Sequence, residues 1–357
     1  MNISWARLTT ILISGSLLAG AGPVLSARGA GAVYTESNAS AGNQILVFHR
    51  AADGTLTPAQ VVASGGMGTG APLASQGAVA LGGDGEWLFA VNAGSHSISS
   101  FRVHAGGLEL MDTADSGGTT PVSLAVSGHL LYVLNQGGTG NIAGFWVGDH
   151  GELEMIPGSS RALSSASASA EEVAFSPDQS TLVVSEKATQ TLDTYKVNAG
   201  GLVTGPTAHP SNGPGPYGFT FTGRDNLLVT EAAINAVSSY DLDHGGLALV
   251  SPSVPSDGAA PCWIAATPDG RFAYATNAHI GTIAGFSVGR EGQLTFLGLT
   301  TTASIPLLDV AATRHHLYAL AEGTHQILEY QVGWDGSLTG IGSTGGLPGS
   351  AAGLVAD

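Results

Sequence analysis

One aromatic residue recurs along this chain at nearly regular intervals, and this repeat is the strongest constraint on its fold. It stands at Phe48, Phe101, Phe145, Tyr195, Tyr240, Phe286 and Tyr330. Each occurrence follows an apolar stretch that ends in Asn or Glu, and each precedes a short turn. Repeats of about 40 to 50 residues are typical of the four-stranded blades of a β-propeller. Seven such positions therefore predict seven blades.

Tight turns separate the expected strands within each repeat. Pairs such as Ser127-Gly128 and Asp269-Gly270 lie between the first and second strands of a repeat. Pairs such as Gly106-Gly107 and Asp335-Gly336 lie between the third and fourth strands. These pairs accept the positive φ of short hairpins. Both sets of turns must lie on one face of the ring, so the longer connections share the other face.

The two ends of the chain are expected to meet in the first blade. The inner strands of several blades follow a proline, at residues 121–126, 216–221, 261–266 and 306–311, and the tail at 348–356 repeats that pattern. No inner strand precedes residues 33–35, which already have the pattern of a second strand. The tail should therefore supply the inner strand of the first blade and leave no open edge.

The predicted fold is all-β: one seven-bladed propeller domain over residues 28–357, with four-stranded antiparallel blades. Its composition of 43% hydrophobic and 11% charged residues with 53 Gly suits short buried strands, so helix should be scarce. A net charge of −16 without any Lys/Arg cluster excludes a nucleic-acid partner. The single cysteine, Cys262, cannot form an internal disulfide and is expected to be buried and inert. We expect a monomer.

Residues 1–27 have the pattern of a secretory signal peptide. Arg7 precedes an apolar run over residues 8–18, and small residues follow at positions 19, 21 and 26. The run is shorter than the ~20 residues of a membrane span, and no later segment qualifies as one. The sequence therefore predicts export to the periplasm or the extracellular space without a stable membrane span. An uncleaved N-terminal anchor is the alternative.

Polar residues collect where the expected second strands end and where the next inner strands begin. The strand ends carry Glu36 or Asn38, Asn92, Asn135, Glu186 with Lys187, Glu231, Asn277 with His279, and Glu322 with His325. The inner-strand starts carry Gln76, Glu171, Glu172, Tyr217, Trp263 and Asp309. In a propeller both sets surround the channel mouth on the long-loop face, where polar groups can orient a small ligand. The two histidines 315 and 316 fall in a turn and are expected to face solvent.

Several roles are open to this ring of residues. Glu186 or Glu231 can activate water while Lys187 or a nearby histidine polarises a carbonyl group. The ligand-binding candidates are Asn92, Asn135, Tyr217, Trp263, Asn277, His279 and Glu322. The structural alternative is that Asn and Glu at strand ends satisfy backbone groups of neighbouring loops. Ca²⁺ or Mg²⁺ is a further alternative, although no Asp-rich calcium loop or zinc spacing is present and no cofactor is expected.

The chain resembles the lactonase family of seven-bladed propellers, which contains the bacterial propeller-type 6-phosphogluconolactonases and the fungal carboxy-muconate lactonizing enzymes. The likeness covers residues 33–357. It rests on Leu88-Phe89-Ala90-Val91-Asn92 before Ile98-Ser99-Ser100-Phe101, on the similar stretches 273–277 and 283–286, and on Phe175-Ser176-Pro177-Asp178 before 182–184. The resemblance implies that acid-base residues in the channel open a sugar-type or muconate-type lactone without a metal.

The ring departs from that family in charge, because enzymes of the family that act on phosphorylated or multiply carboxylated substrates place arginines in the channel. Here Lys187, His279 and His325 are the only basic residues among the ring positions. A neutral or weakly charged lactone therefore fits better. The first hypothesis is an exported lactonase-like hydrolase that opens a sugar-type or other small lactone. The second is a non-catalytic propeller that binds a small molecule, glycan or protein, and the third is a metal-dependent lactonase.

Overall fold

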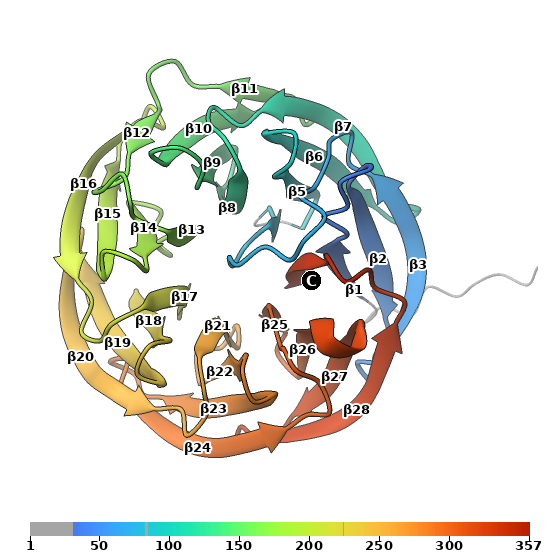
Figure 1. The fold of residues 1–357 in the computed structure, drawn as a ribbon, viewed down its shortest axis with the longest axis vertical. Coiled ribbons are helices and arrows are strands. Elements are labelled where there is room, and N and C mark those ends of the chain that lie inside the picture. The colour runs from blue at the N-terminus through green and yellow to red at the C-terminus, as the bar shows by residue number, and fades with distance from the viewer. Residues whose placement is uncertain (1–30, 83–84, 224) are drawn as a thin grey trace, which may run out of the picture.

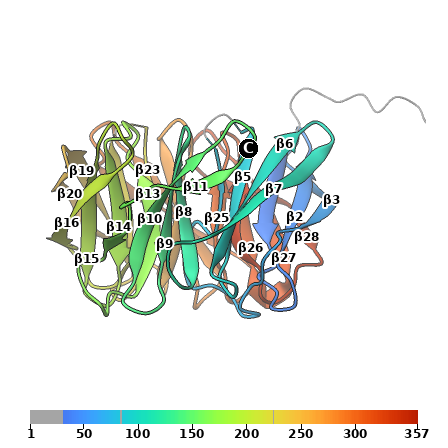
Figure 2. The ribbon, with the colours of Figure 1, turned by 90° about the horizontal axis from the view of Figure 1, so that it is seen from above.

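Seven antiparallel sheets surround a central axis in this protein (Figure 1). The computed structural model describes residues 31–82, 85–223 and 225–357. Seen from the side, the ring is a disc, with strands crossing its thickness and turns on both faces (Figure 2). The predicted seven-bladed propeller is confirmed. The proposed signal peptide at residues 1–27 lies outside the described residues.

Each sheet is one blade, numbered here in chain order and given from its inner to its outer strand. Blade 1 is β29 (Ala352–Ala356), β1 (Gly31–Glu36), β2 (Gln44–Arg50) and β3 (Leu56–Ala63). Blade 2 is β4 (Val79–Leu81), β5 (Trp87–Asn92), β6 (Ser97–His104) and β7 (Gly107–Asp115). Blade 3 is β8 (Pro121–Ser127), β9 (Leu130–Asn135) and β10 (Asn141–Val147), with β11 (Leu153–Met155) and β12 (Arg161–Ala162) both on its outer side.

The other four blades each have four strands in chain order. Blade 4 is β13 (Ala170–Phe175), β14 (Thr181–Glu186), β15 (Thr191–Val197) and β16 (Val203–Pro210). Blade 5 is β17 (Pro216–Phe221), β18 (Asn226–Glu231), β19 (Ala236–Asp243) and β20 (Gly246–Pro255). Blade 6 is β21 (Pro261–Ala266), β22 (Phe272–Asn277), β23 (Thr282–Val288) and β24 (Leu294–Thr301). Blade 7 is β25 (Val310–Ala312), β26 (His316–Ala321), β27 (Gln326–Val332) and β28 (Leu338–Gly345).

The recurring aromatic residue lies on the third strand of every blade and is buried each time, so its spacing reported the blades correctly. Tyrosines of three second strands then connect neighbouring blades on the short-turn face. The hydroxyl of Tyr132 donates to Gly201 O, that of Tyr274 to Gly336 O and that of Tyr318 to Gly54 O. Each acceptor glycine has a positive φ in the turn of the next blade. The turn glycines therefore shape the hairpins and also place a carbonyl group toward the preceding blade.

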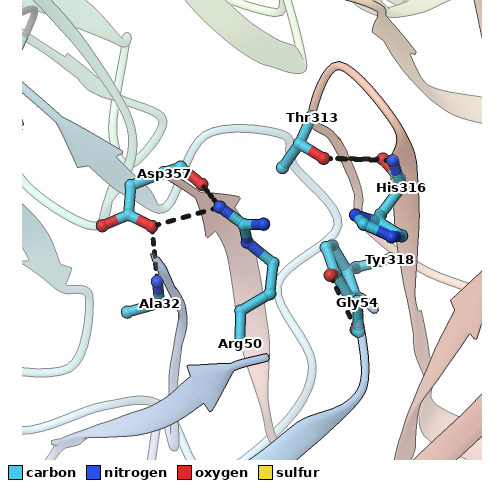
Figure 3. Close-up of polar contacts among 7 residues, drawn as sticks. All are labelled: Ala32, Arg50, Gly54, Thr313, His316, Tyr318 and Asp357. Atoms are coloured by element: carbon cyan, nitrogen blue, oxygen red, sulfur yellow. Dashed lines mark hydrogen bonds and ion pairs between the residues drawn. The ribbon is translucent and has the colours of Figure 1, made fainter. Parts of the chain in front are cut away.

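The two ends of the chain close the ring as predicted. β29 pairs antiparallel with β1, with Val33 opposite Ala356 and Glu36 opposite Ala352. A clasp of three residues reinforces this pairing (Figure 3). The guanidinium of Arg50 donates to Asp357 O at 2.6 Å, and the Asp357 carboxylate accepts from the Ala32 N–H. No sheet edge is left open in the first blade on its inner side.

Three details differ from the sequence predictions. The inner strand expected at 306–311 is only Val310–Ala312, because the Asp309 carboxylate accepts from the N–H of Val310 and turns the backbone before the strand. The tail strand begins at Ala352 rather than 348, since a turn joins Ala351 N to Pro348 O. His316 does not face solvent: it begins β26, and its ring lies against Gly54 (Figure 3). Alternation along β26 points this side chain inward.

Helix is scarce as expected: within the described ranges the only helical element is the 3₁₀ turn η1 (Glu322–Thr324). No helix in that part of the chain is long and apolar enough to cross a membrane.

The segment between β3 and β4 reaches into the centre of the ring and joins the inner strands of several blades (light blue in Figure 1). The Gln76 side chain donates to Phe219 O and Ile264 O and accepts from the Ile264 N–H. The indole N–H of Trp263 donates to Ser75 O at 2.7 Å. A Cβ on Gly218 would lie 2.3 Å from the Gln76 Oε1, so this approach requires glycine. Gln76 therefore occupies the axis.

Candidate functional site

The polar residues that end the second strands are buried beneath loops. The Glu231 carboxylate accepts from the Gly213 N–H at 2.7 Å and from the hydroxyls of Ser238 and Ser253 at 2.6 Å each. Glu231 itself has no exposed surface. Its carboxylate thus anchors the loop that connects blade 4 to blade 5, because buried N–H and O–H groups need acceptors.

The same arrangement recurs around the ring. Asn92 accepts from Ser64 Oγ, Asn135 donates to Ser116 O, and Asn277 accepts from Ser256 Oγ. In blade 4 the Glu186 carboxylate accepts from both the N–H and the hydroxyl of Ser164. All four of these strand-end residues are fully buried. We call each such contact between a loop and a strand-end residue a loop latch.

A sequence signal for these latches exists and was not recognised. Ser-x-Gly stands at 64–66, 116–118, 211–213 and 256–258, at the start of the loop into the next blade. A Cβ on Gly66 would lie 2.4 Å from the Asn92 side chain, and one on Gly258 would lie 2.1 Å from Asn277. The glycine lets the loop lie directly on the amide or carboxylate. The ligand-binding role of Asn92, Asn135 and Asn277, and the catalytic role of Glu186 and Glu231, stay predictions.

Three other predicted residues do come together. Lys187, Tyr217 and His279, from blades 4, 5 and 6, line one pocket of about 510 Å³ on the long-loop face. Cys262 contributes to the same wall, and the rest is formed mainly by small apolar residues such as Ala232 and Ala233. The pocket lies beside the axis that Gln76 fills.

Bulges at the start of three consecutive inner strands aim the side chains of this region. The strand register shifts between Ala170 and Glu172, between Pro216 and Phe219, and between Pro261 and Trp263. The residues skipped by the pairing include Glu171, Tyr217 and Cys262. A bulged residue leaves the ladder and its side chain is redirected. The sequence placed these residues at the inner-strand starts but carries no clear signal for the bulges.

Lys187 is held in place from behind. Its Nζ lies 2.5 Å from Glu171 Oε1 and 5.0 Å from the centre of the Tyr217 ring. The Glu171 side chain is 1% exposed, whereas that of Lys187 is 39% exposed. Burial raises the pKa of Glu171 above its usual value, and the contact with Lys187 partly opposes that rise. The pair therefore presents an ammonium group toward the pocket and hides its counter-ion.

Three other titratable side chains line the pocket: those of Cys262, Tyr217 and His279. Burial raises the pKa of Cys262 to about 12, so its thiol stays protonated, as expected for an inert cysteine. Burial also raises the pKa of Tyr217, with the Glu171 carboxylate adding to the rise. His279 is exposed at the rim. Proton transfer in the pocket thus has one exposed imidazole and one ammonium group available.

Two predicted ligand-binding residues lie outside this pocket. Trp263 is buried, packs edge-on against Tyr217 with ring centres 5.3 Å apart, and uses its indole N–H for Ser75. Glu322 begins η1 in blade 7. In the part of the chain that the structure describes, no group of three or more His, Cys, Asp or Glu side chains is placed to hold a metal ion. A second cavity, of about 470 Å³, lies on the short-turn face beside His315 and His316.

The closed ring of seven antiparallel blades defines a seven-bladed β-propeller, and Lys187, Tyr217 and His279 line a pocket on its long-loop face. Residues 40–161 match the model of the family described as lactonase, 7-bladed beta-propeller. The resemblance noted in the sequence is confirmed over these residues: this part of the chain is similar to the lactonase family of seven-bladed propellers.

Solved structures share the fold over nearly the whole chain. A periplasmic gluconolactonase of Pseudomonas aeruginosa is 19% identical, with a TM-score of 0.73, covering 92% of this chain and 99% of its own. A Bacteroides fragilis protein with a provisional 6-phosphogluconolactonase name is 20% identical, with a TM-score of 0.74, covering 93% of this chain and 99% of its own.

The chain is also similar, over a smaller part of its length, to a propeller that is named a lyase. Virginiamycin B lyase of Staphylococcus aureus is 13% identical, with a TM-score of 0.55, covering 75% of this chain and 84% of its own. No curated protein matches the chain in sequence. At these identities the solved structures establish the fold and leave the chemistry to the site itself.

Proposed function

We propose that this protein is an exported lactonase-like hydrolase that opens a small neutral ring ester in the pocket between blades 4, 5 and 6. One observation carries the proposal: Lys187, Tyr217 and His279 come from three successive blades and line the same pocket. Residues far apart in the sequence thereby supply an ammonium group, a phenol and an imidazole to a single ligand-sized space.

The chemistry follows from these groups. The Lys187 ammonium donates to the lactone carbonyl oxygen and stabilises the negative charge that develops there. The His279 imidazole accepts a proton from the attacking water, whose oxygen bonds to the carbonyl carbon. The bond between that carbon and the ring oxygen then breaks, and the proton passes to the ring oxygen. The product is the open hydroxy acid. The Tyr217 hydroxyl, protonated because burial raises its pKa, can donate to a ring substituent.

The pocket wall favours a small ligand without a net charge. Lys187 is neutralised by Glu171, and the Ala232 and Ala233 side chains leave room beside it. A sugar-type lactone presents one carbonyl group and several hydroxyls, which match these donors. Export is part of the proposal and is supported by the pattern of residues 1–27. The similar gluconolactonase of P. aeruginosa is periplasmic by name.

The test is a panel of neutral sugar lactones and homoserine lactones, assayed with the purified protein with and without chelator. Lys187→Met should lower kcat/KM by about 100-fold, the usual cost of losing one oxyanion donor. Lys196→Met, on the outer part of blade 4, is the matched control and should leave the rate unchanged. Glu186→Gln and Glu231→Gln test the catalytic roles predicted from the sequence. If no lactone opens faster than in buffer alone, the proposal fails. Loss of activity with chelator would favour the metal-dependent alternative.

Binding without catalysis is the second candidate, and the loop latches favour it. The carboxylates of Glu186 and Glu231 are fully buried and engaged with loop donors. Under this hypothesis the pocket binds a small molecule or glycan and opens no ring. Saturable binding of a lactone without turnover, lost in Lys187→Met, would establish it.

A further inference from the structure

The charge of the pocket is set by one buried carboxylate. Glu171 Oε1 lies 2.5 Å from Lys187 Nζ, and its side chain is 1% exposed. Its second oxygen, Oε2, is buried without any hydrogen-bond partner. Leaving a carboxylate oxygen buried and unpaired costs free energy, so packing alone does not favour Glu at this place.

The repeats show what other blades place at the same position. The bulge after the first residue of the inner strand holds Val122 in blade 3 and Cys262 in blade 6. Both are buried and neutral, whereas blade 4 has Glu171 there. Lys187 follows the end of β14, where blade 5 has Ala232 and blade 6 has Ala278. Both members of the ion pair therefore differ from the uncharged residues at the same positions of blade 6.

We propose that Glu171 is a specificity-determining residue that makes the pocket select uncharged ring esters and reject anionic ones. The inference deepens the proposed function and rests on it for the identity of the ligand as a ring ester. Lys187 is the only permanently cationic side chain among the described residues that line the pocket. With Glu171 beside it, an anionic ligand meets an ammonium group whose charge is already balanced, inside a protein of net charge −16.

Removing the counter-charge should reverse this preference. In Glu171→Gln the amide fills the same volume, and the Lys187 ammonium faces the pocket unbalanced. An anionic ligand near a half-exposed cation gains a screened interaction, which corresponds to about a five- to tenfold gain in affinity. A neutral ligand of the same shape should change much less.

The experiment uses two ring esters that differ only in charge: 5-oxotetrahydrofuran-2-carboxamide and 5-oxotetrahydrofuran-2-carboxylate. Dissociation constants are measured by ligand-observed NMR at fixed ionic strength, and ring opening is followed in parallel. The wild-type protein should prefer the carboxamide. Glu171→Gln should shift the affinity ratio toward the carboxylate by about five- to tenfold. The double variant Glu171→Gln/Lys187→Met, which has neither charge, should prefer the carboxamide again.

The affinity ratio of the two ligands tests the role of Glu171, and ring opening is recorded separately. An unchanged affinity ratio in folded Glu171→Gln overturns the inference while leaving the hydrolase proposal intact. A shifted ratio supports the inference whether or not these two rings open, and the lactone panel decides the hydrolase proposal separately. If neither ligand binds to either protein, the inference is overturned.

A second measurement covers the case in which Glu171→Gln does not fold. Burial raises the pKa of Glu171, so acid protonates it before ordinary carboxylates. In a His279→Gln variant, where no imidazole at the pocket rim can become charged, affinity for the carboxylate ligand should therefore rise as the pH falls, until the ligand itself is protonated. A flat or falling affinity would contradict the proposed role.

Discussion

Blade 4 carries two carboxyl groups in its loop latch. The carboxylates of Glu186 and Asp193 both accept from the Ser164 N–H, at 2.9 Å each, and both residues are fully buried. The equivalent positions of blade 5, also seven residues apart, hold Glu231 and Ser238, and the Ser238 hydroxyl donates to the Glu231 carboxylate at 2.6 Å. Blade 5 thus has a hydrogen-bond donor where blade 4 has a second carboxyl group.

The carboxyl pair makes stability depend on pH. Burial, with the Glu186 carboxyl alongside, raises the pKa of Asp193 to about 8, compared with about 3.9 in an unfolded chain. The folded state therefore retains a proton that the unfolded state releases. This contribution to the free energy of unfolding is complete below about pH 4 and is lost progressively as the pH rises through about 8. The upper limit of this loss of stability is about 6 kcal/mol, at 1.36 kcal/mol per pKa unit, and relaxation of the pair should reduce it to about 2 kcal/mol.

Asp193→Asn should remove this dependence. The Asn oxygen can accept from Ser164 N–H and its amide can donate to Glu186, as Asn43 does to Glu36. We expect the variant to be about 2 kcal/mol more stable than the wild type at pH 8.5 and nearly equal to it at about pH 3.5, below the pKa of the unfolded chain.

Urea unfolding at the two pH values measures the difference. The matched control is Asp241→Asn, because Asp241 is exposed on β19 of the next blade. A destabilisation of Asp193→Asn by the same amount at both pH values would refute the idea that folding binds a proton at this pair.

Three further perturbations test the latches, the closure and the axis. Gly258→Ala forces a Cβ to within 2.1 Å of the Asn277 side chain and should cost about 2 kcal/mol, whereas Gly223→Ala, with no atom within 4 Å, should cost under about 0.5 kcal/mol in urea unfolding. Asp357→Ala removes the carboxylate that accepts from the Ala32 N–H and lies 3.9 Å from the Arg50 guanidinium, so hydrogen exchange in β29 should accelerate, and unchanged rates would argue against the clasp. Gln76→Leu strands the Ile264 N–H and two carbonyl groups and should destabilise the ring by about 2 kcal/mol; a loss below about 0.5 kcal/mol would contradict its role at the axis.

The ring and its closure could be predicted from the sequence because both follow from periodicity. An aromatic residue such as Phe145 marks a third strand wherever it recurs, and the missing inner strand before residue 33 requires a replacement from elsewhere in the chain. These inferences need only the order of strands, which the repeat supplies directly.

The candidate site was harder to predict because it depends on the direction of side chains. Glu231 is the last residue of its strand and points under a loop, whereas Lys187 lies one position later in the repeat and lines a pocket. The sequence pattern marks the strand end but does not show which of the two positions faces the pocket. The Ser-x-Gly motif identifies the loop over Glu231, whereas the bulge that aims Glu171 has no comparable signature. The contacts of Gln76 with Phe219 and Ile264 were also not predicted, because they depend on how the loop before β4 crosses the ring.

Because β29 pairs with β1, the first blade cannot be completed until the end of the chain has been synthesised. The two strands are separated by about 300 residues, and a ribosome that adds 5 to 20 residues per second takes roughly 15 to 60 s to cover that distance. Throughout that interval β1 has no inner neighbour from its own chain, although six other blades can already form behind it. The nascent protein therefore has an unpaired strand edge during most of its elongation. This edge can pair with other chains until residues 352–356 have been synthesised and cover it.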